Sequence, residues 1–118
     1  MEIWKEFSFD SAHLLPNVPE GHKCRRLHGH TYTVRIYVAG EPDPEVGWII
    51  DFGDIRLAFQ PILDALDHRY LNEIEGLENP TAEVLARWIW KRLAPRLHGL
   101  CRIEIQETCT SGCTYSGD

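Results

Sequence analysis

The segment from His28 to Ala39 constrains the fold more than any other part of this sequence. Successive side chains of a β-strand point to opposite sides of the sheet, so alternate residues share a face. One face would carry His28, His30, Tyr32, Val34, Ile36 and Val38, and the other Thr31, Thr33, Arg35 and Tyr37. This alternation predicts a strand with one buried face whose first two inward positions are histidines.

Two further segments alternate in the same way. Residues 2–10 (EIWKEFSFD) predict a first strand, and His13 keeps the parity of its apolar residues if the strand continues. Residues 100–108 (LCRIEIQET) predict a third strand, after which a CTSGC turn leads to a short terminal strand at TYS. The prolines and glycine of LLPNVPEGHKC predict a loop between the first two strands.

Two helices are predicted between the second and third strands. Asp51 is suited to cap the first, in which apolar residues recur at three- and four-residue steps over residues 52–66. Pro61 is expected to kink this helix, because proline lacks an N–H donor and collides with the preceding turn. Asn79 is suited to cap the second helix, with a proline at its first position and Gly99 at its end.

The order of elements is strand, strand, helix, helix, strand, strand. A chain of 118 residues is expected to form one domain over residues 1–118. This order predicts an α+β fold in which two helices cover one face of a four-stranded antiparallel sheet. The outer strands leave sheet edges unpaired, so association with further copies through these edges is expected.

Composition and charge narrow the class of protein. Hydrophobic residues make up 43% and charged residues 25%, which is typical of a globular domain. A formal net charge of -6 argues against a general nucleic-acid binder. The start, MEIWKEFSFD, lacks the features of a secretion signal, and no apolar run is long enough for a membrane span. A cytoplasmic protein is expected, with its four cysteines unpaired.

The His-Gly-His sequence at residues 28–30 is a candidate metal site. Residues two apart on a strand lie about 6.6 Å apart on the same face, so the imidazoles of His28 and His30 can converge on one ion. His13 would supply a third ligand if the first two strands pair. Three histidines with an open position are typical of a catalytic zinc site. The alternative is that these are ordinary strand histidines, because a His-X-His pair alone is a weak signal.

Cys24 lies four residues before His28 in CRRLHGH. A thiol beside Lys23, Arg25, Arg26 and a divalent cation would favour its thiolate form, which acts as a base or nucleophile. Cys24 could instead be a fourth zinc ligand, which would close the metal shell and leave no room for chemistry. The residues themselves leave both interpretations open.

Other ionisable groups stand where packing alone does not explain them. Asp67 and His68 fall at the predicted end of the first helix, where the carboxylate could orient the imidazole for acid-base work. The alternative is a surface acid and a histidine on the helix dipole. Glu107 shares parity with apolar strand residues, so it either needs N–H donors from a ligand or lies at a frayed strand end. Cys109 and Cys113 are better explained as turn or buried cysteines than as metal ligands.

Six motifs of this sequence occur together in one known family. They are FSFDSAHLLP, CRRLHGH, GWIIDFGD, LDHRYLN, NPTAEVLARWIW and ETCTSGCTY. From about residue 4 to its end, the sequence resembles the 6-pyruvoyl-tetrahydropterin synthase family, and most closely its carboxy-forming branch, which serves queuosine biosynthesis. The pyruvoyl-forming branch usually has its cysteine further ahead of HGH than Cys24 is from His28.

The resemblance implies a tunnelling fold (T-fold), in which the sheets of three copies join around a barrel and two trimers stack into a homohexamer. It also implies roles for individual residues. These are zinc binding by His13, His28 and His30, proton abstraction by Cys24, proton relay by His68 with Asp67, and pterin anchoring with a possible part in the relay for Glu107.

The implied reaction converts 7,8-dihydroneopterin triphosphate to 6-carboxy-5,6,7,8-tetrahydropterin and releases acetaldehyde and triphosphate. Zinc would be the only cofactor, because reducing equivalents move within the substrate. We hypothesise that Arg25, Arg26 and Arg69 contact the triphosphate. The alternatives are the pyruvoyl-forming reaction, a zinc-dependent hydrolase, which would leave Cys24 and Glu107 unexplained, and a non-catalytic metal- or pterin-binding module.

Overall fold

A computed structural model describes residues 1–118, and its centre is one sheet with the strand order β3-β1-β2-β4-β5. The four longer strands are antiparallel neighbours. They are β1 (Glu2–His13), β2 (His28–Ala39), β4 (Leu100–Thr108) and β5 (Ser111–Tyr115). β1 and β2 pair along their whole length, with His13 opposite His28 at one end. The predicted strands are confirmed, except that β5 begins at Ser111, because the turn before it is confined to residues 109–110.

The expectation of four antiparallel strands is wrong in one respect, because β3 (Arg69–Tyr70) adds a fifth. β3 runs parallel to β1 and pairs with Ser11 and Ala12. A strand of two residues is too short to show an alternating pattern, so the sequence carries no signal for it. β3 holds the segment that follows the first helix against the end of β1.

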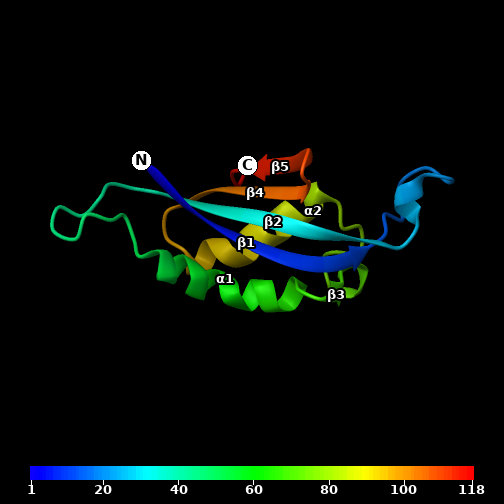
Figure 1. Ribbon diagram of the computed structural model, residues 1–118, viewed down its shortest axis with the longest axis horizontal. Coiled ribbons are helices and arrows are strands. Elements are labelled where there is room, and N and C mark those ends of the chain that lie inside the picture. Colours follow the sequence, from blue (N-terminus) through cyan, green and yellow to red (C-terminus); the bar gives the residue numbers. More distant parts are fainter.

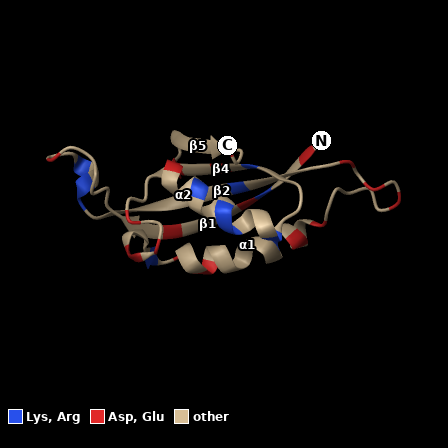
Figure 2. Cartoon of the chain, turned by 180° about the vertical axis from the view of Figure 1, so that it is seen from behind, with Lys and Arg blue, Asp and Glu red and all other residues tan.

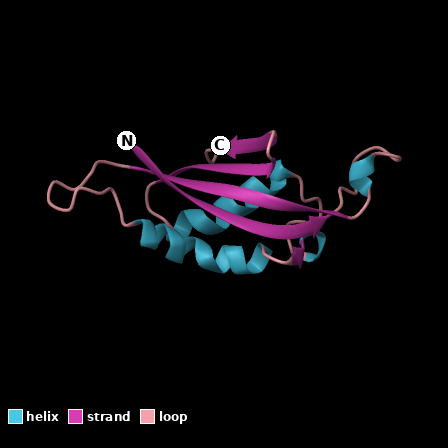
Figure 3. Cartoon of the chain, viewed as in Figure 1, coloured by secondary structure: helices cyan, strands magenta, loops and turns pink.

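The first helix, α1 (Phe52–Leu66), and the second helix, α2 (Ala82–Leu93), lie against one face of the sheet (Figure 1, Figure 3). Asp51 caps α1 as predicted, and its side chain accepts a hydrogen bond from the N–H of Gly53 at 2.8 Å. The helix continues past Pro61 for five more residues. Neither helix is long and apolar enough to cross a membrane.

The second helix, α2 (Ala82–Leu93), begins later than predicted. Thr81, not Asn79, accepts the capping hydrogen bond, from the N–H of Val84 at 3.1 Å. Both residue types cap helices well, so the sequence does not choose between them. In the structure a side chain from β1 contacts the carbonyl of Pro80, which keeps this residue outside the helix.

The end of α2 also differs from the prediction. The helix stops at Leu93 and passes into a short 3-10 turn, η3 (Ala94–Arg96), which contains Pro95. Gly99, at a φ of 85°, lies in the turn just before β4 and does not end the helix. Proline cannot continue the hydrogen-bond ladder of an α-helix, which explains the earlier stop.

The hydrophobic core lies between the sheet and the two helices. Its largest fully buried side chains are Tyr32, Phe9, Phe59, Ile36, Ile55, Leu66, Leu71, Leu77, Leu85, Ile89, Leu93 and Ile103. The predicted inward face of β2 is therefore confirmed. At one end of the core, the apolar side chains of β1 give way to Ser11 and His13, the only polar residues that are buried. The core thus has one polar end.

The molecule is elongated, with extents of 58 × 24 × 23 Å, because a loop projects from each end (Figure 1). Residues 14–27 form the loop at the histidine end and contain the short 3-10 helix η1 (Lys23–Arg25). Residues 40–51 form the other loop. Figure 2 shows basic residues on η1 and acidic residues along the second loop. Positive charge therefore lies beside the polar end of the core.

Candidate metal centre and active site

Three histidine side chains converge where β1 stops and β2 starts. His13 lies opposite His28 in the strand register, and His30 follows on the same face of β2. Their ligand nitrogens all lie within 4.8 Å of one another, and the Nε2 atoms of His13 and His28 are 3.0 Å apart. The predicted strand pairing that would bring His13 to the other two histidines is confirmed.

Backbone carbonyls fix the tautomers of two of these rings. His13 Nδ1 lies 2.9 Å from the oxygen of Pro80, and His28 Nδ1 lies 2.7 Å from that of Arg26. A carbonyl oxygen only accepts hydrogen bonds, so each Nδ1 carries a hydrogen and each neutral ring has a lone pair on Nε2. Two lone pairs at 3.0 Å repel each other unless a cation lies between them. The contact therefore indicates a cation site.

This donor set fits zinc. Tetrahedral Zn–N bonds of about 2.0–2.1 Å would place two ligand nitrogens about 3.3–3.4 Å apart, slightly more than the distance observed. Metal binding requires neutral imidazole, and burial lowers the pKa of His13 against the opposing effects of the Pro80 carbonyl and Glu107. Hydrogen bonds from Nδ1 to carbonyls also orient metal-binding histidines in general.

Glu107 lies at the same polar end. Its Oε1 atom is 3.4 Å from His13 Nε2 and 3.5 Å from His30 Nε2, so the inward orientation predicted for it is confirmed. The side chain is 26% exposed, and no lysine or arginine forms an ion pair with it. The carboxylate is therefore available to accept N–H donors of a ligand.

Cys24 lines a cavity of about 560 Å³ together with the three histidines and Glu107. Its N–H donates to His22 Nδ1 at 3.0 Å, and its carbonyl accepts from the N–H of Leu15 at 2.7 Å. Both backbone groups of Cys24 are thus held. The thiol is not among the ligand atoms that lie within 4.8 Å of one another. The cavity is large enough for a small-molecule ligand beside the candidate metal centre.

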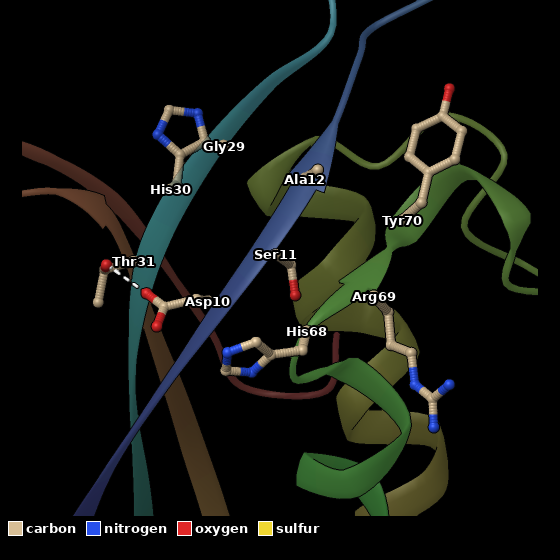
Figure 4. Close-up of a pocket in the computed structure, with 9 residues that line it drawn as sticks. All are labelled: Asp10, Ser11, Ala12, Gly29, His30, Thr31, His68, Arg69 and Tyr70. Carbon is tan, nitrogen blue, oxygen red and sulfur yellow. Dashed lines mark hydrogen bonds between the residues drawn. The ribbon is translucent and has the colours of Figure 1, made fainter.

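Asp67 and His68 lie elsewhere. They follow α1, and His68 Nδ1 is 3.0 Å from Asp67 Oδ1. That carboxylate also accepts the N–H of Asp10 at 3.0 Å; this bond, followed by the one from His68, holds the pKa of Asp67 below its ordinary value. His68 lines a separate hollow with Asp10 and Arg69 (Figure 4). The pair does not line the cavity that Cys24 lines in the same chain.

The three arginines that we expected to contact triphosphate have different surroundings. Arg26 lines the cavity of the metal centre. Arg25 Nη1 donates to the carbonyls of Pro16 at 3.1 Å and Val18 at 2.9 Å, so this side chain braces its own loop. Arg69 lines the separate hollow. The structure thus leaves Arg26 as the candidate beside the metal centre.

Some groups of the site escaped the sequence analysis. The carbonyls of Pro80 and Arg26 orient metal-centre histidines, but no pattern of side chains marks a carbonyl. Asp10 and Ser11 contact the segment that holds the Asp67–His68 pair. Ser11 lies on the inward face of β1, where the pattern of the strand predicts an apolar residue. A serine at such a position is a signal in the sequence that marks a buried hydroxyl.

Comparisons with known proteins identify the family of this chain. The family model described as 6-pyruvoyl tetrahydropterin synthase matches residues 2–118. The chain belongs to this family. It is therefore a lyase of a pterin-converting family, with the T-fold that the motifs implied.

Individual relatives cover most of the chain. A 6-carboxy-5,6,7,8-tetrahydropterin synthase of Synechocystis sp. is 45% identical, over 96% of this chain and 91% of its own length. A dihydroneopterin monophosphate aldolase of Pyrococcus furiosus is 36% identical, over 78% of this chain and 74% of its own length. The solved structure of Caenorhabditis elegans 6-pyruvoyl tetrahydropterin synthase matches with a TM-score of 0.92 at 26% identity, covering 100% of this chain and 96% of that one.

Proposed function

We propose that the protein converts 7,8-dihydroneopterin triphosphate to 6-carboxy-5,6,7,8-tetrahydropterin, with release of acetaldehyde and triphosphate, as a zinc enzyme of queuosine biosynthesis in the cytoplasm. The observation that carries the proposal is the 3.0 Å contact between the Nε2 atoms of His13 and His28, in a cavity that Cys24 and Glu107 also line. The name of the Synechocystis relative supports the choice of reaction.

His13, His28 and His30 would hold the ion, and zinc bound there would supply Lewis acidity to the hydroxyls of the substrate side chain. The rings of His13 and His28 are oriented before any ligand arrives, because backbone carbonyls accept their Nδ1 hydrogens. All three histidines line the cavity, so a substrate in the cavity would lie beside the ion.

Glu107 and Cys24 would act on the two parts of the substrate. The Glu107 carboxylate would accept N–H groups of the pterin ring and so fix its orientation. The Cys24 thiolate would remove a proton from the side chain of the substrate. Lys23 and Arg26 line the same cavity. The pterin ring and its side chain would thus both lie in the cavity that the three histidines line.

The Asp67–His68 pair would relay protons in the cavity of a neighbouring subunit. Within one chain His68 and Cys24 line different hollows, which share only His30. His68 directly precedes β3, one of the two edge strands, and unpaired edges are suited to pairing between copies. We therefore propose a homohexamer of two trimers whose sites lie between subunits.

Mixed oligomers test this arrangement. Cys24→Ala and His68→Ala proteins should each be nearly inactive, but co-expressed subunits should recover about a quarter of wild-type activity, because each site draws each intact residue with a probability of about one half. The measurement is turnover by oligomers purified through a different tag on each variant. Mixed oligomers as inactive as the parent variants would contradict a site shared between subunits.

Arg26 is expected to contact the triphosphate. Arg26→Glu should raise KM by about tenfold to a hundredfold, since a hydrogen bond to a charged group contributes about 1.5–3 kcal/mol. Zinc content should stay unchanged. Steady-state kinetics and metal analysis test this, with Arg56→Glu as the control because Arg56 is exposed on α1. An unchanged KM for Arg26→Glu would refute this contact.

Product analysis tests the reaction itself. The zinc-loaded protein is incubated anaerobically with 7,8-dihydroneopterin triphosphate, and acetaldehyde and pterins are followed by mass spectrometry. We expect acetaldehyde and 6-carboxy-tetrahydropterin. A pyruvoyl product without acetaldehyde would assign the sister activity. No turnover of the triphosphate, with cleavage of dihydroneopterin monophosphate instead, would assign the activity named for the Pyrococcus relative.

A further inference from the structure

Ser11 is buried without a part in the chemistry proposed above. It is 6% exposed and lies on the inward face of β1 between Phe9 and His13, where apolar packing would suit an alanine or valine better. Its hydroxyl donates a hydrogen bond to the carbonyl oxygen of Leu66, the last residue of α1. Leu66 directly precedes the Asp67–His68 pair.

Residues 66–68, where the chain leaves α1, form a corner that three side-chain or backbone hydrogen bonds attach to Asp10 and Ser11 of β1. The hydrogen bond from Ser11 is one of these three. The N–H of Asp10 donates to Asp67 Oδ1 at 3.0 Å, and the carbonyl of Asp10 accepts the N–H of His68 at 2.7 Å. Three consecutive residues, 66–68, are thus held by two consecutive residues of β1. Figure 4 shows Asp10, Ser11 and His68 together at this corner.

The corner has an unusual backbone conformation. His68 has a φ of 57°, in the left-handed region, and it is the only residue other than glycine with a positive φ. Such a conformation is uncommon for a residue with a side chain and depends on the surrounding contacts. The imidazole itself is 78% exposed, so packing does not hold it. Its position therefore depends on the backbone bonds to β1 and on the contact with Asp67.

We propose that Ser11 is a positioning residue for the Asp67–His68 pair, a role that rests on the proposed function of this pair as a proton relay. Its hydroxyl satisfies the carbonyl of Leu66, which at a helix C-terminus has no partner within the helix. Without the hydroxyl this carbonyl would be unpaired, and the corner would shift to regain a hydrogen bond. His68 would then leave the position from which it transfers a proton.

Two variants separate the effect of the hydroxyl from the effect of side-chain shape. Ser11→Thr keeps the hydroxyl, and Ser11→Val introduces a side chain of nearly the same shape as threonine but without the hydroxyl. Ser11→Ala removes the hydroxyl with no added atoms, so it remains informative if the larger residues disturb the core. Ser8→Ala is the matched control, because Ser8 is an exposed serine of the same strand without a side-chain hydrogen bond.

Amide hydrogen exchange measures the local stability of this corner without a substrate. In the full-length zinc protein, amides of a peptide spanning residues 64–70 should exchange about tenfold faster in Ser11→Val and Ser11→Ala than in wild type, because their local opening becomes easier. Ser11→Thr and Ser8→Ala should match wild type. Equal exchange in all variants would overturn the inference, whatever the protein does to pterins.

Kinetics then show whether Ser11 acts through His68. Ser11→Val should lower kcat by about tenfold to a hundredfold, with KM and zinc content little changed, because small displacements of a reacting group have effects of this size. In a His68→Ala background the same change should lower kcat no further. A second, equal loss in that background would overturn the inference. Absence of turnover in the wild-type protein would instead contradict the proposed function. The exchange result would still show whether the Ser11 hydroxyl stabilises residues 66–68.

Discussion

Replacing His28 by alanine is expected to abolish stable zinc binding and to lower turnover by at least a factor of about one thousand. The cluster offers three candidate histidine ligands, and the loss of one leaves two rings at the ends of two strands. A Lewis acid contributes several kcal/mol of transition-state stabilisation, and about 4 kcal/mol corresponds to about a thousandfold in rate. Metal analysis after dialysis and steady-state kinetics measure the two effects.

His98→Ala is the control for this experiment. His98 is exposed and lines neither the cavity of the metal centre nor the hollow of His68, so zinc content and turnover should stay at wild-type values. If His28→Ala kept one equivalent of zinc and full activity, the three histidines would not be the metal centre. The close contact between the Nε2 atoms of His13 and His28 would then have to be explained by a proton that the two rings share.

Replacing Cys24 by alanine is expected to lower kcat by about a hundredfold to ten-thousandfold, the range that proton transfer by a positioned side chain contributes. Zinc content should not change, because the thiol does not belong to the group of ligand atoms within 4.8 Å of one another. The measurement is kcat for the triphosphate substrate, with zinc determined in the same samples.

The outcome also separates the two roles that the sequence left open for Cys24. A loss of zinc together with activity would make Cys24 a metal ligand, and full activity would leave a binding function alone. Cys101→Ala is the matched control. Its Sγ donates to the carbonyl of Tyr37 at 3.4 Å, and burial raises the pKa of its thiol, so it stays protonated and outside the chemistry.

The histidine cluster was predictable from the sequence because two strand periods determine it. The alternation from His28 to Ala39 sets the inward face of β2, and the parity of β1 carries on to His13. Once the two strands pair, His13 has to lie beside His28, as the register shows. Glu107 was predictable for the same reason, because the alternation of β4 turns it inward with Ile105.

Features that depend on three-dimensional contacts were not predictable. β3 has only two residues, and its pairing with β1 is fixed by the turn after α1. Thr81 and Asn79 are both suitable caps by residue type, and the contact between the Pro80 carbonyl and His13, which favours Thr81, forms only in the folded chain. The position of His68 at the end of α1 was predicted, but its placement outside the cavity of Cys24 depends on the hydrogen bonds of residues 66–68 to Asp10 and Ser11, which form only in the folded chain. These outcomes need the tertiary structure.

In the proposed mechanism, the β1–β2 pairing separates the residues that would hold the ion from the thiol that would remove a proton. All three histidines belong to the paired ends of two strands, whereas Cys24 belongs to the loop of residues 14–27 that joins them. Insertions or deletions in a surface loop change a domain little, while a one-residue slip of a strand turns its side chains to the other face. Changes in the length or direction of this loop would therefore move the thiol while the paired strands keep the three histidines together.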